Sequence, residues 1–166
     1  METVFFKGSP CHTYGNIPAV GIKAPDFKLV TKDLAEITCD DFKGKRVVLN
    51  VFPSLDTPVC AASVRRFNVE ASKLDNTAVV CVSMDLPFAM SRFCSAEGID
   101  NVTAASAFRS PTFAQQYGLQ LVDGPLAGLL ARAVIVMDEN HQIIYSDLVG
   151  EITDEPDYEG AISVLK

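Results

Sequence analysis

The chain has 166 residues, 48% hydrophobic and 21% charged, which suits one domain over 1–166 with its own core and no tendency to disorder. The formal net charge is −7, and no basic cluster is longer than "KGKR" at 43–46, so we expect no nucleic-acid partner. No apolar stretch approaches the roughly 18 residues of a membrane span, and "METVFFKGSP" does not resemble a secretory signal, so we expect a cytoplasmic protein without membrane contact.

The first 40 residues are rich in β-forming and turn-forming residues. "TVFF" is followed by the turn segments "GSP" and "YGN", and "FKLV" at 27–30 has the composition of a short strand. We therefore expect residues 1–40 to form a β-rich extension, a hairpin packed on the main domain.

Three apolar runs further along the chain are typical of buried strands. "VVLNVF" (47–52) and "AVVCVS" (78–83) are rich in β-branched residues, and "VTAASAF" (102–108) is a weaker example. Helical segments separate them. Apolar residues recur at intervals of three and four between 64 and 74, and "PFAMSRFCSAEG" (87–98) begins with a proline and ends with a glycine, as helices often do.

The last third of the chain predicts a short helix, a hairpin and a closing helix. "PTFAQQYG" (111–118) is the short helix, and "AVIVMDENHQIIYSDLV" (133–149) contains two apolar strands around a "DEN" turn. "EPDYEGAISVLK" (155–166) predicts the closing helix. The whole pattern indicates an α/β fold with a central mixed sheet flanked by helices.

The cysteines raise the question of which thiol is reactive. They lie at positions 11, 39, 60, 81 and 94. Their number is odd, no Cys-x-x-Cys pair occurs, and only two histidines are present, so we expect no metal site. Unpaired cysteines of a reducing compartment are either inert core residues or reactive ones.

Cys60 is the cysteine whose position predicts reactivity. Thr57 suits a helix N-cap and Pro58 suits the first helical position, which places Cys60 in the first turn. The free N–H groups and the positive end of the helix dipole favour an anion there, and the thiolate is the nucleophilic form of cysteine. Ligands of such sheets also bind beyond the carboxyl ends of the strands, where this residue lies. The alternative is that Cys60 merely fills space under the helix.

"FPSLDTPVC" resembles the peroxidatic motif of the peroxiredoxins, Pro-x-x-x-Thr-x-x-Cys, matched by Pro53, Thr57 and Cys60. "LPFAMSRFC", "DGPLAGLLARAVIVMDE" and "EITDEPDY" are similar to later segments of the thiol peroxidase branch, so the resemblance extends over almost the whole chain. It implies a thioredoxin-like fold with an N-terminal β-hairpin, and a peroxidase that reduces alkyl or lipid hydroperoxides and hydrogen peroxide without a cofactor.

The resemblance also implies roles for individual residues. Cys60 would attack the peroxide and become a sulfenic acid. The Thr57 hydroxyl would face both sulfur and peroxide, and Pro53 would shield the sulfur from water. Arg132, the only charge in "LLARAVIVM", would hold the sulfur ionised and stabilise the charge that develops on the peroxide. Without the resemblance, an arginine at a strand start is equally well read as a solvated edge residue.

Cys94 matches the resolving cysteine of the same branch, although a buried helix residue is the simpler interpretation. As the resolving residue it would form an intramolecular disulfide with Cys60, and thioredoxin would reduce that disulfide. A disulfide needs Cα atoms about 4.4–6.8 Å apart, whereas the two cysteines are predicted on separate helices. We therefore expect the first turn after Thr57 and part of 87–98 to unwind. Members of the branch are typically homodimers, which implies a homodimer here.

Two other functions fit the same cysteine. A cysteine hydrolase would need His12 or His141 within hydrogen-bond reach of the Cys60 sulfur. A redox sensor or a thioredoxin-like binding module would be oxidised by peroxide but would not turn over. Cys81, inside an apolar strand, predicts core packing only.

Overall fold

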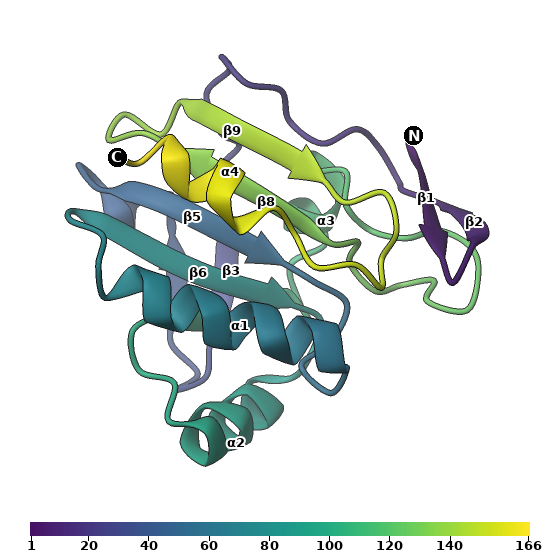
Figure 1. Cartoon of the computed structure of the whole chain (residues 1–166), viewed down its shortest axis with the longest axis horizontal. Coiled ribbons are helices and arrows are strands. Elements are labelled where there is room, and N and C mark those ends of the chain that lie inside the picture. Colours follow the sequence, from purple (N-terminus) through teal and green to yellow (C-terminus); the bar gives the residue numbers. More distant parts are fainter.

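The structure, a computed structural model, describes residues 1–166 and contains two sheets (Figure 1). The strands are β1 (Thr3–Phe6), β2 (Ser9–His12), β3 (Lys28–Thr31), β4 (Glu36–Thr38), β5 (Arg46–Val51), β6 (Thr77–Ser83), β7 (Thr103–Ser106), β8 (Ala133–Met137) and β9 (Ile143–Leu148). The helices are α1 (Pro58–Ala71), α2 (Pro87–Glu97), α3 (Pro111–Gln116) and α4 (Tyr158–Ser163), with the 3₁₀ helix η1 (Cys39–Phe42). Every strand and helix predicted after residue 47 is present, with small shifts at the ends.

The main sheet has seven strands in the order β4-β3-β7-β6-β5-β8-β9. β5, β6 and β7 are parallel, and β8, β9, β3 and β4 are antiparallel to their neighbours. The predicted mixed sheet is thus confirmed. β3 and β4 belong to the part predicted as an N-terminal extension, yet they pair onto the main sheet beside β7, and only β1 and β2 form a separate hairpin.

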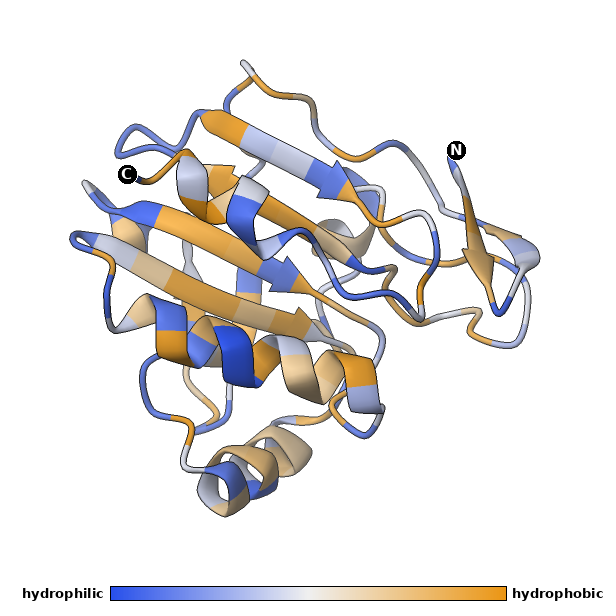
Figure 2. Cartoon of the chain, in the orientation of Figure 1, coloured by the Kyte–Doolittle hydropathy of each residue, from blue (hydrophilic) through white to orange (hydrophobic).

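Each face of the sheet carries its own hydrophobic core. α1, α2 and α4 cover one face, where Phe67 of α1 meets Tyr158 of α4 edge to face, with ring centroids 5.4 Å apart. α3 covers the other face, where Phe113 and Tyr117 stack with centroids 4.6 Å apart. Figure 2 shows hydrophobic residues along β5, β6 and β8, the central strands that both cores bury. No helix is both long enough and apolar enough to cross a membrane.

The topology brings three connecting segments to one edge of the sheet. Because β5, β6 and β7 are parallel, the segments that follow them all begin at the same edge. The β1-β2 hairpin lies at this end of the molecule, toward which the arrows of β5 and β6 point in Figure 1. Its Val4 and Cys11 share a small core with Leu121, Ala131 and Ile152. That core places the hairpin beside the residue that precedes β8, Arg132.

Candidate active site

Cys60 lies in the first turn of α1, as predicted. α1 begins at Pro58, and Thr57 before it has extended backbone angles (φ −108°, ψ 146°). The Cys60 side chain has no solvent exposure by surface area, yet it lines a cavity of about 230 Å³. The sulfur is therefore shielded from bulk water but faces a space that a small molecule can occupy.

Thr57 occupies the N-cap position without capping the helix through its side chain. Its hydroxyl donates to the carbonyl oxygen of Ser54 at 2.9 Å, and no side-chain cap bond is formed. The predicted N-cap position of Thr57 is therefore confirmed, while its hydroxyl bonds within the tight turn before α1 rather than to the helix. Thr57 and Pro53 both line the cavity beside Cys60. A hydroxyl oxygen that donates one bond can still accept one from a ligand in that cavity.

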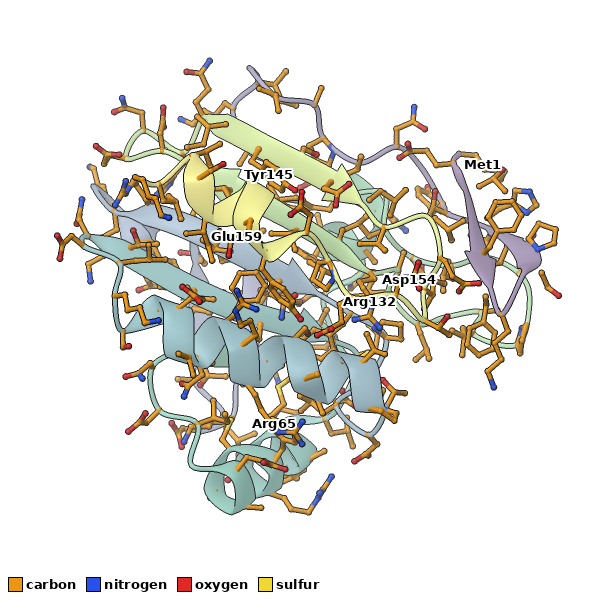
Figure 3. All side chains as sticks on the ribbon, viewed as in Figure 1. Met1, Arg65, Arg132, Tyr145, Asp154 and Glu159 are labelled. Carbon is orange, nitrogen blue, oxygen red and sulfur yellow. The ribbon has the colours of Figure 1, made fainter.

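Arg132 contacts the sulfur directly. Its Nη2 donates to Cys60 Sγ at 3.2 Å and its Nε donates to the carbonyl oxygen of Ile152 at 2.9 Å. The residue is only 2% exposed, so the reading of a solvated edge residue is wrong. Figure 3 shows Arg132 near the N-terminal end of α1. A guanidinium and a helix N-terminus together favour a negative charge on the sulfur.

One donor of this guanidinium has no partner. Arg132 Nη1 is buried and makes no hydrogen bond. Buried polar groups are nearly always paired, so an unpaired donor on a residue that lines a cavity indicates a ligand with an acceptor atom. A peroxide oxygen bound next to Cys60 is an acceptor of that kind.

The rest of the cavity wall is mostly apolar and comes from distant parts of the chain. Besides Cys60, Arg132, Pro53 and Thr57, its lining residues are Phe6, Lys7, Ser54, Pro58, Val59, Leu126, Leu129, Ile152 and Thr153. Sequence reasoning missed the residues of the β1-β2 turn and of the 126–129 segment. These two segments are distant in the chain, and only their tertiary contact creates a shared cavity.

Glu151 fastens the hairpin onto this wall. Its carboxylate accepts hydrogen bonds from the backbone N–H groups of Lys7 and Gly8 at 3.2 and 2.9 Å, and from the N–H and hydroxyl of Thr153, both at 3.0 Å. The bond from the Thr153 N–H, followed by that from the Gly8 N–H, lowers the pKa of Glu151. The next residue, Ile152, supplies the carbonyl that holds Arg132.

Cys94 lies in the last turn of α2 and is 4% exposed. It shares the core beneath α1 and α2 with Cys60, but it does not line the cavity, and all five cysteines are unbonded. Burial raises the pKa of Cys94, with Lys32 lowering it and Asp33 raising it to smaller extents. Its nucleophilic thiolate is therefore disfavoured where the residue now lies.

Two ion pairs connect the α1 region to α2. Arg92 Nη2 lies 2.9 Å from Asp56 Oδ1, just before Thr57. Arg65 forms a two-pronged pair with Glu97, at 3.1 and 3.0 Å. Any movement that joins Cys60 to Cys94 acts on these contacts, which lie on the surface and are individually weak.

The remaining cysteines show no sign of reactivity. Cys81 is buried in β6, and burial raises its pKa to about 12. Burial likewise raises the pKa of Cys39 to about 12 and raises that of Cys11. The core role predicted for Cys81 is confirmed by its place beneath α1, where Asn50 Nδ2 approaches its sulfur at 3.7 Å.

Neither histidine can serve Cys60 as a base. His12 Nδ1 lies 2.6 Å from Asp123 Oδ2, and His141 Nε2 lies 3.0 Å from the carbonyl oxygen of Phe42. Neither lines the cavity. The geometry that a cysteine hydrolase requires is absent, and Arg132 takes the position beside the sulfur instead.

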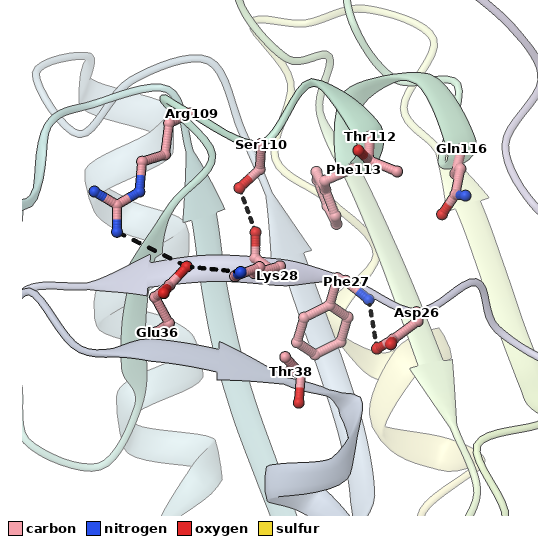
Figure 4. Close-up of a pocket in the computed structure, with 10 residues that line it drawn as sticks. All are labelled: Asp26, Phe27, Lys28, Glu36, Thr38, Arg109, Ser110, Thr112, Phe113 and Gln116. Atoms are coloured by element: carbon pink, nitrogen blue, oxygen red, sulfur yellow. Dashed lines mark hydrogen bonds and ion pairs between the residues drawn. The ribbon is translucent and has the colours of Figure 1, made fainter.

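A larger cavity of about 460 Å³ lies between β3, β4 and α3 (Figure 4). Its charged side chains already have partners, because Glu36 lies 3.4 Å from Lys28 and 3.8 Å from Arg109, and Asp26 accepts hydrogen bonds from the backbone N–H groups of Phe27 and Cys39. It contains no thiol, and its buried Phe113 belongs to the core on the face opposite α1. The smaller cavity at Cys60 is therefore the candidate active site.

Comparison with known proteins agrees with this site. The Redoxin family model matches residues 19–162. A protein of Corynebacterium glutamicum described as "Thiol peroxidase" is 53% identical over 99% of both chains. The crystal structure of a peroxiredoxin-like protein from Aquifex aeolicus superposes with a TM-score of 0.94 at 41% identity, covering 99% of this chain and 96% of the other.

A thiol peroxidase from Chromobacterium violaceum shares the fold at 20% identity, with a TM-score of 0.91 over 99% of this chain and 96% of its own. The predicted thioredoxin-like fold is confirmed by these matches. The chain therefore belongs to the Redoxin family, within the thiol peroxidase branch of the peroxiredoxins, and is an oxidoreductase that reduces peroxides.

Proposed function

We propose that Cys60 is the peroxidatic residue of this enzyme. The observation that carries the proposal is the 3.2 Å contact between Arg132 Nη2 and Cys60 Sγ, inside a cavity that a peroxide can enter. The thiolate attacks one oxygen of the hydroperoxide, so that an S–O bond forms as the O–O bond breaks. The sulfur is oxidised to a sulfenic acid, and the departing alkoxide takes a proton and leaves as an alcohol, or as water.

Three neighbours support this step. Arg132 stabilises the charge on the sulfur and, through its unpaired Nη1, the charge that moves onto the peroxide oxygens. Thr57 offers its hydroxyl to the bound peroxide from the cavity wall, at the expense of its bond to Ser54. Pro53 covers the sulfur and excludes water, which protects the sulfenic acid.

The cavity lining supports alkyl or lipid hydroperoxides as preferred substrates over hydrogen peroxide. Phe6, Leu126, Leu129 and Ile152 form an apolar wall beside the sulfur. Hydrogen peroxide cannot use such a surface, whereas each buried CH₂ of an alkyl chain contributes about 0.8 kcal/mol of binding.

We assign the resolving step to Cys94. Its thiolate would attack the sulfenic sulfur of Cys60, forming an intramolecular disulfide and releasing water, and a dithiol reductant of the thioredoxin type would reduce the disulfide by exchange. The raised pKa of buried Cys94 is consistent with a thiol that becomes reactive only after α2 opens. A cytoplasmic location belongs to the same proposal, because a reducing compartment suits five free thiols. A homodimer is proposed with it, because members of the thiol peroxidase branch are typically homodimers.

Turnover with thioredoxin, thioredoxin reductase and NADPH tests the proposal. Cys60→Ser should abolish peroxide-dependent NADPH oxidation. Cys94→Ser should undergo one oxidation and then stall, and Cys39→Ser should behave like the wild type. Activity retained in Cys60→Ser would overturn the assignment of the peroxidatic residue. A wild-type protein that is oxidised once and never recycled would instead support the redox sensor.

Crystal structures of the reduced and the disulfide forms test the movement. We expect the backbone to differ at 57–62 and at 88–98, because the cysteines lie on separate helices. Identical backbones in both segments would rule out the proposed unwinding.

A further inference from the structure

Asp85 is a hydrogen-bonding centre that the peroxidase motif does not include. It follows β6 and lies two residues before the start of α2. Its carboxylate accepts hydrogen bonds from the Ser54 hydroxyl at 2.8 Å, the Leu55 N–H at 2.8 Å and the Ser83 hydroxyl at 2.6 Å. Its backbone carbonyl accepts a fourth, from the Ser106 hydroxyl at 2.5 Å. Asp85, in the segment that follows β6, thus joins the segment that follows β5 to the last residues of β6 and β7.

The bonds to Ser54 and Leu55 hold the segment that leads to the peroxidatic cysteine. That segment carries Pro53 and Thr57, which line the cavity, and α1 begins directly after it. Ser83 belongs to β6, so the carboxylate fastens this segment to the centre of the sheet. Hydrogen bonds to an ionised carboxylate are about twice as strong as neutral ones. Asp85 does not line the cavity and is therefore a positioning residue.

The same residue lies at the base of the segment that carries Cys94. Only Leu86 separates Asp85 from the first residue of α2. The two segments that must rearrange before Cys60 and Cys94 can form a disulfide are thus joined at one carboxylate. Ion pairs further along α2 are exposed, whereas this carboxylate is partly buried and accepts three hydrogen bonds.

We propose that Asp85 sets the equilibrium between a closed conformation that reacts with peroxide and an open one in which Cys60 reaches Cys94. The inference builds on the proposed function of the two cysteines. The closed conformation is needed for oxidation of Cys60, and the open one for disulfide formation. Loss of the Asp85 contacts should therefore change the two rates in opposite directions, which general damage to the fold does not do.

Rapid-quench mass spectrometry can separate the two steps, and the absence of Trp makes it preferable to Trp fluorescence. Cumene hydroperoxide is the oxidant in both measurements. Oxidation of Cys60 is followed in chains that also carry Cys94→Ser, and disulfide formation is followed in chains that keep both cysteines. For Asp85→Ala we expect disulfide formation to become about tenfold faster and oxidation at least about threefold slower. Asp85→Asn should change both rates in the same directions but by less than Asp85→Ala, because its amide keeps hydrogen-bond partners for the segment but loses the charge that strengthens the bonds.

Two further variants keep the outcome interpretable. Ser54→Ala removes one of the contacts and should give a smaller change in the same directions. Asp100→Ala removes an exposed carboxylate without side-chain bonds and should change neither rate. Disulfide formation that is unchanged or slower in folded Asp85→Ala and Ser54→Ala would overturn the role of Asp85. If Cys60→Ser still reacted with the peroxide, the proposed function itself would fail, independently of Asp85.

Discussion

Cys60 and Cys94 are almost equally buried, at 0% and 4% exposure, and belong to the same core, yet their electrostatic surroundings are opposite. Cys60 lies at the positive end of α1 and receives a hydrogen bond from Arg132. Cys94 lies at the negative end of α2, where its carbonyl accepts from Gly98 and Ile99, and burial raises its pKa. Burial therefore does not decide which thiol is reactive. The two thiols differ instead in the helix end that each occupies and in the cation bonded to Cys60, and on these differences the proposed roles rest.

Removing the guanidinium of Arg132 should have the largest effect, because it takes away the cation that distinguishes Cys60 from Cys94. Arg132→Met leaves Cys60 at the helix N-terminus but without the guanidinium, and we expect peroxide reduction to fall by about 10²- to 10³-fold, as for loss of one oxyanion donor. The measurement is kcat/KM in the thioredoxin-coupled assay. Arg46→Met is the matched control, because Arg46 also donates to backbone carbonyls, those of Leu165 and Asp75, but far from the cavity. Equal losses in both variants would contradict the catalytic role.

A third buried thiol, that of Cys81, extends the comparison, because its effect on stability should depend on pH. Cys81 has no cation nearby, and burial raises its pKa to about 12. Up to about pH 9 the Cys81 thiol keeps its proton in both the folded and the unfolded chain, so its burial contributes fully to the free energy of unfolding. Between about pH 9 and 12 only the unfolded chain releases the proton, so the free energy of unfolding falls by up to about 1.4 kcal/mol per pH unit.

Cys81→Ala removes this contribution. Urea unfolding at pH 8 should show a variant about 1 kcal/mol less stable, because a small cavity forms, and the deficit should shrink toward pH 10. Val80→Ala, next to it in β6, creates a cavity without a titrating group and should keep its deficit at every pH. A Cys81→Ala deficit that stays constant with pH would show that the thiol does not ionise on unfolding in this range.

The parts of the site that the sequence predicts are those that lie close together in the chain. Pro53, Thr57 and Cys60 fall within one turn and one helix start, so local rules of capping and helix dipoles locate them. The alternation of strands and helices after residue 47 is equally local, and the mixed sheet followed from it. Local patterns do not assign a role to Arg132, because a lone arginine at a strand start fits a solvated edge as well as an active site, and only the family resemblance distinguishes the two.

Contacts between distant segments could not be predicted from these patterns. The side chain of Phe6 meets the cavity because distant segments hold the hairpin in place, through the small core around Val4 and through the bonds from its turn to Glu151. Asp85 stands in an ordinary strand-to-helix connection, and its partner Ser54 is 31 residues away. Likewise, nothing in "FKLV" distinguishes a strand of a separate hairpin from a strand at the edge of the main sheet, where β3 lies.

The smallest expected effect is that of the exposed ion pair between Arg92 of α2 and Asp56, which lies just before α1. Arg92 precedes Cys94 by two residues, and its partner Asp56 directly precedes Thr57, so the pair holds the closed arrangement. Both side chains are more than half exposed, and such pairs contribute little. Arg92→Gln should therefore speed disulfide formation by only about two- to fivefold at low salt.

Salt and a matched arginine separate this effect from general loosening. At 1 M salt the Debye length falls to about 3 Å, so wild type and Arg92→Gln should form the disulfide at the same rate. Arg66→Gln also removes an exposed arginine, one paired with Glu70 and Glu159 on the side of α4, and should leave the rate unchanged. A rate increase in Arg92→Gln that persists at 1 M salt would mean that the side chain acts through packing on α2. The contrast between the cysteines would then depend on helix stability as well as on charge.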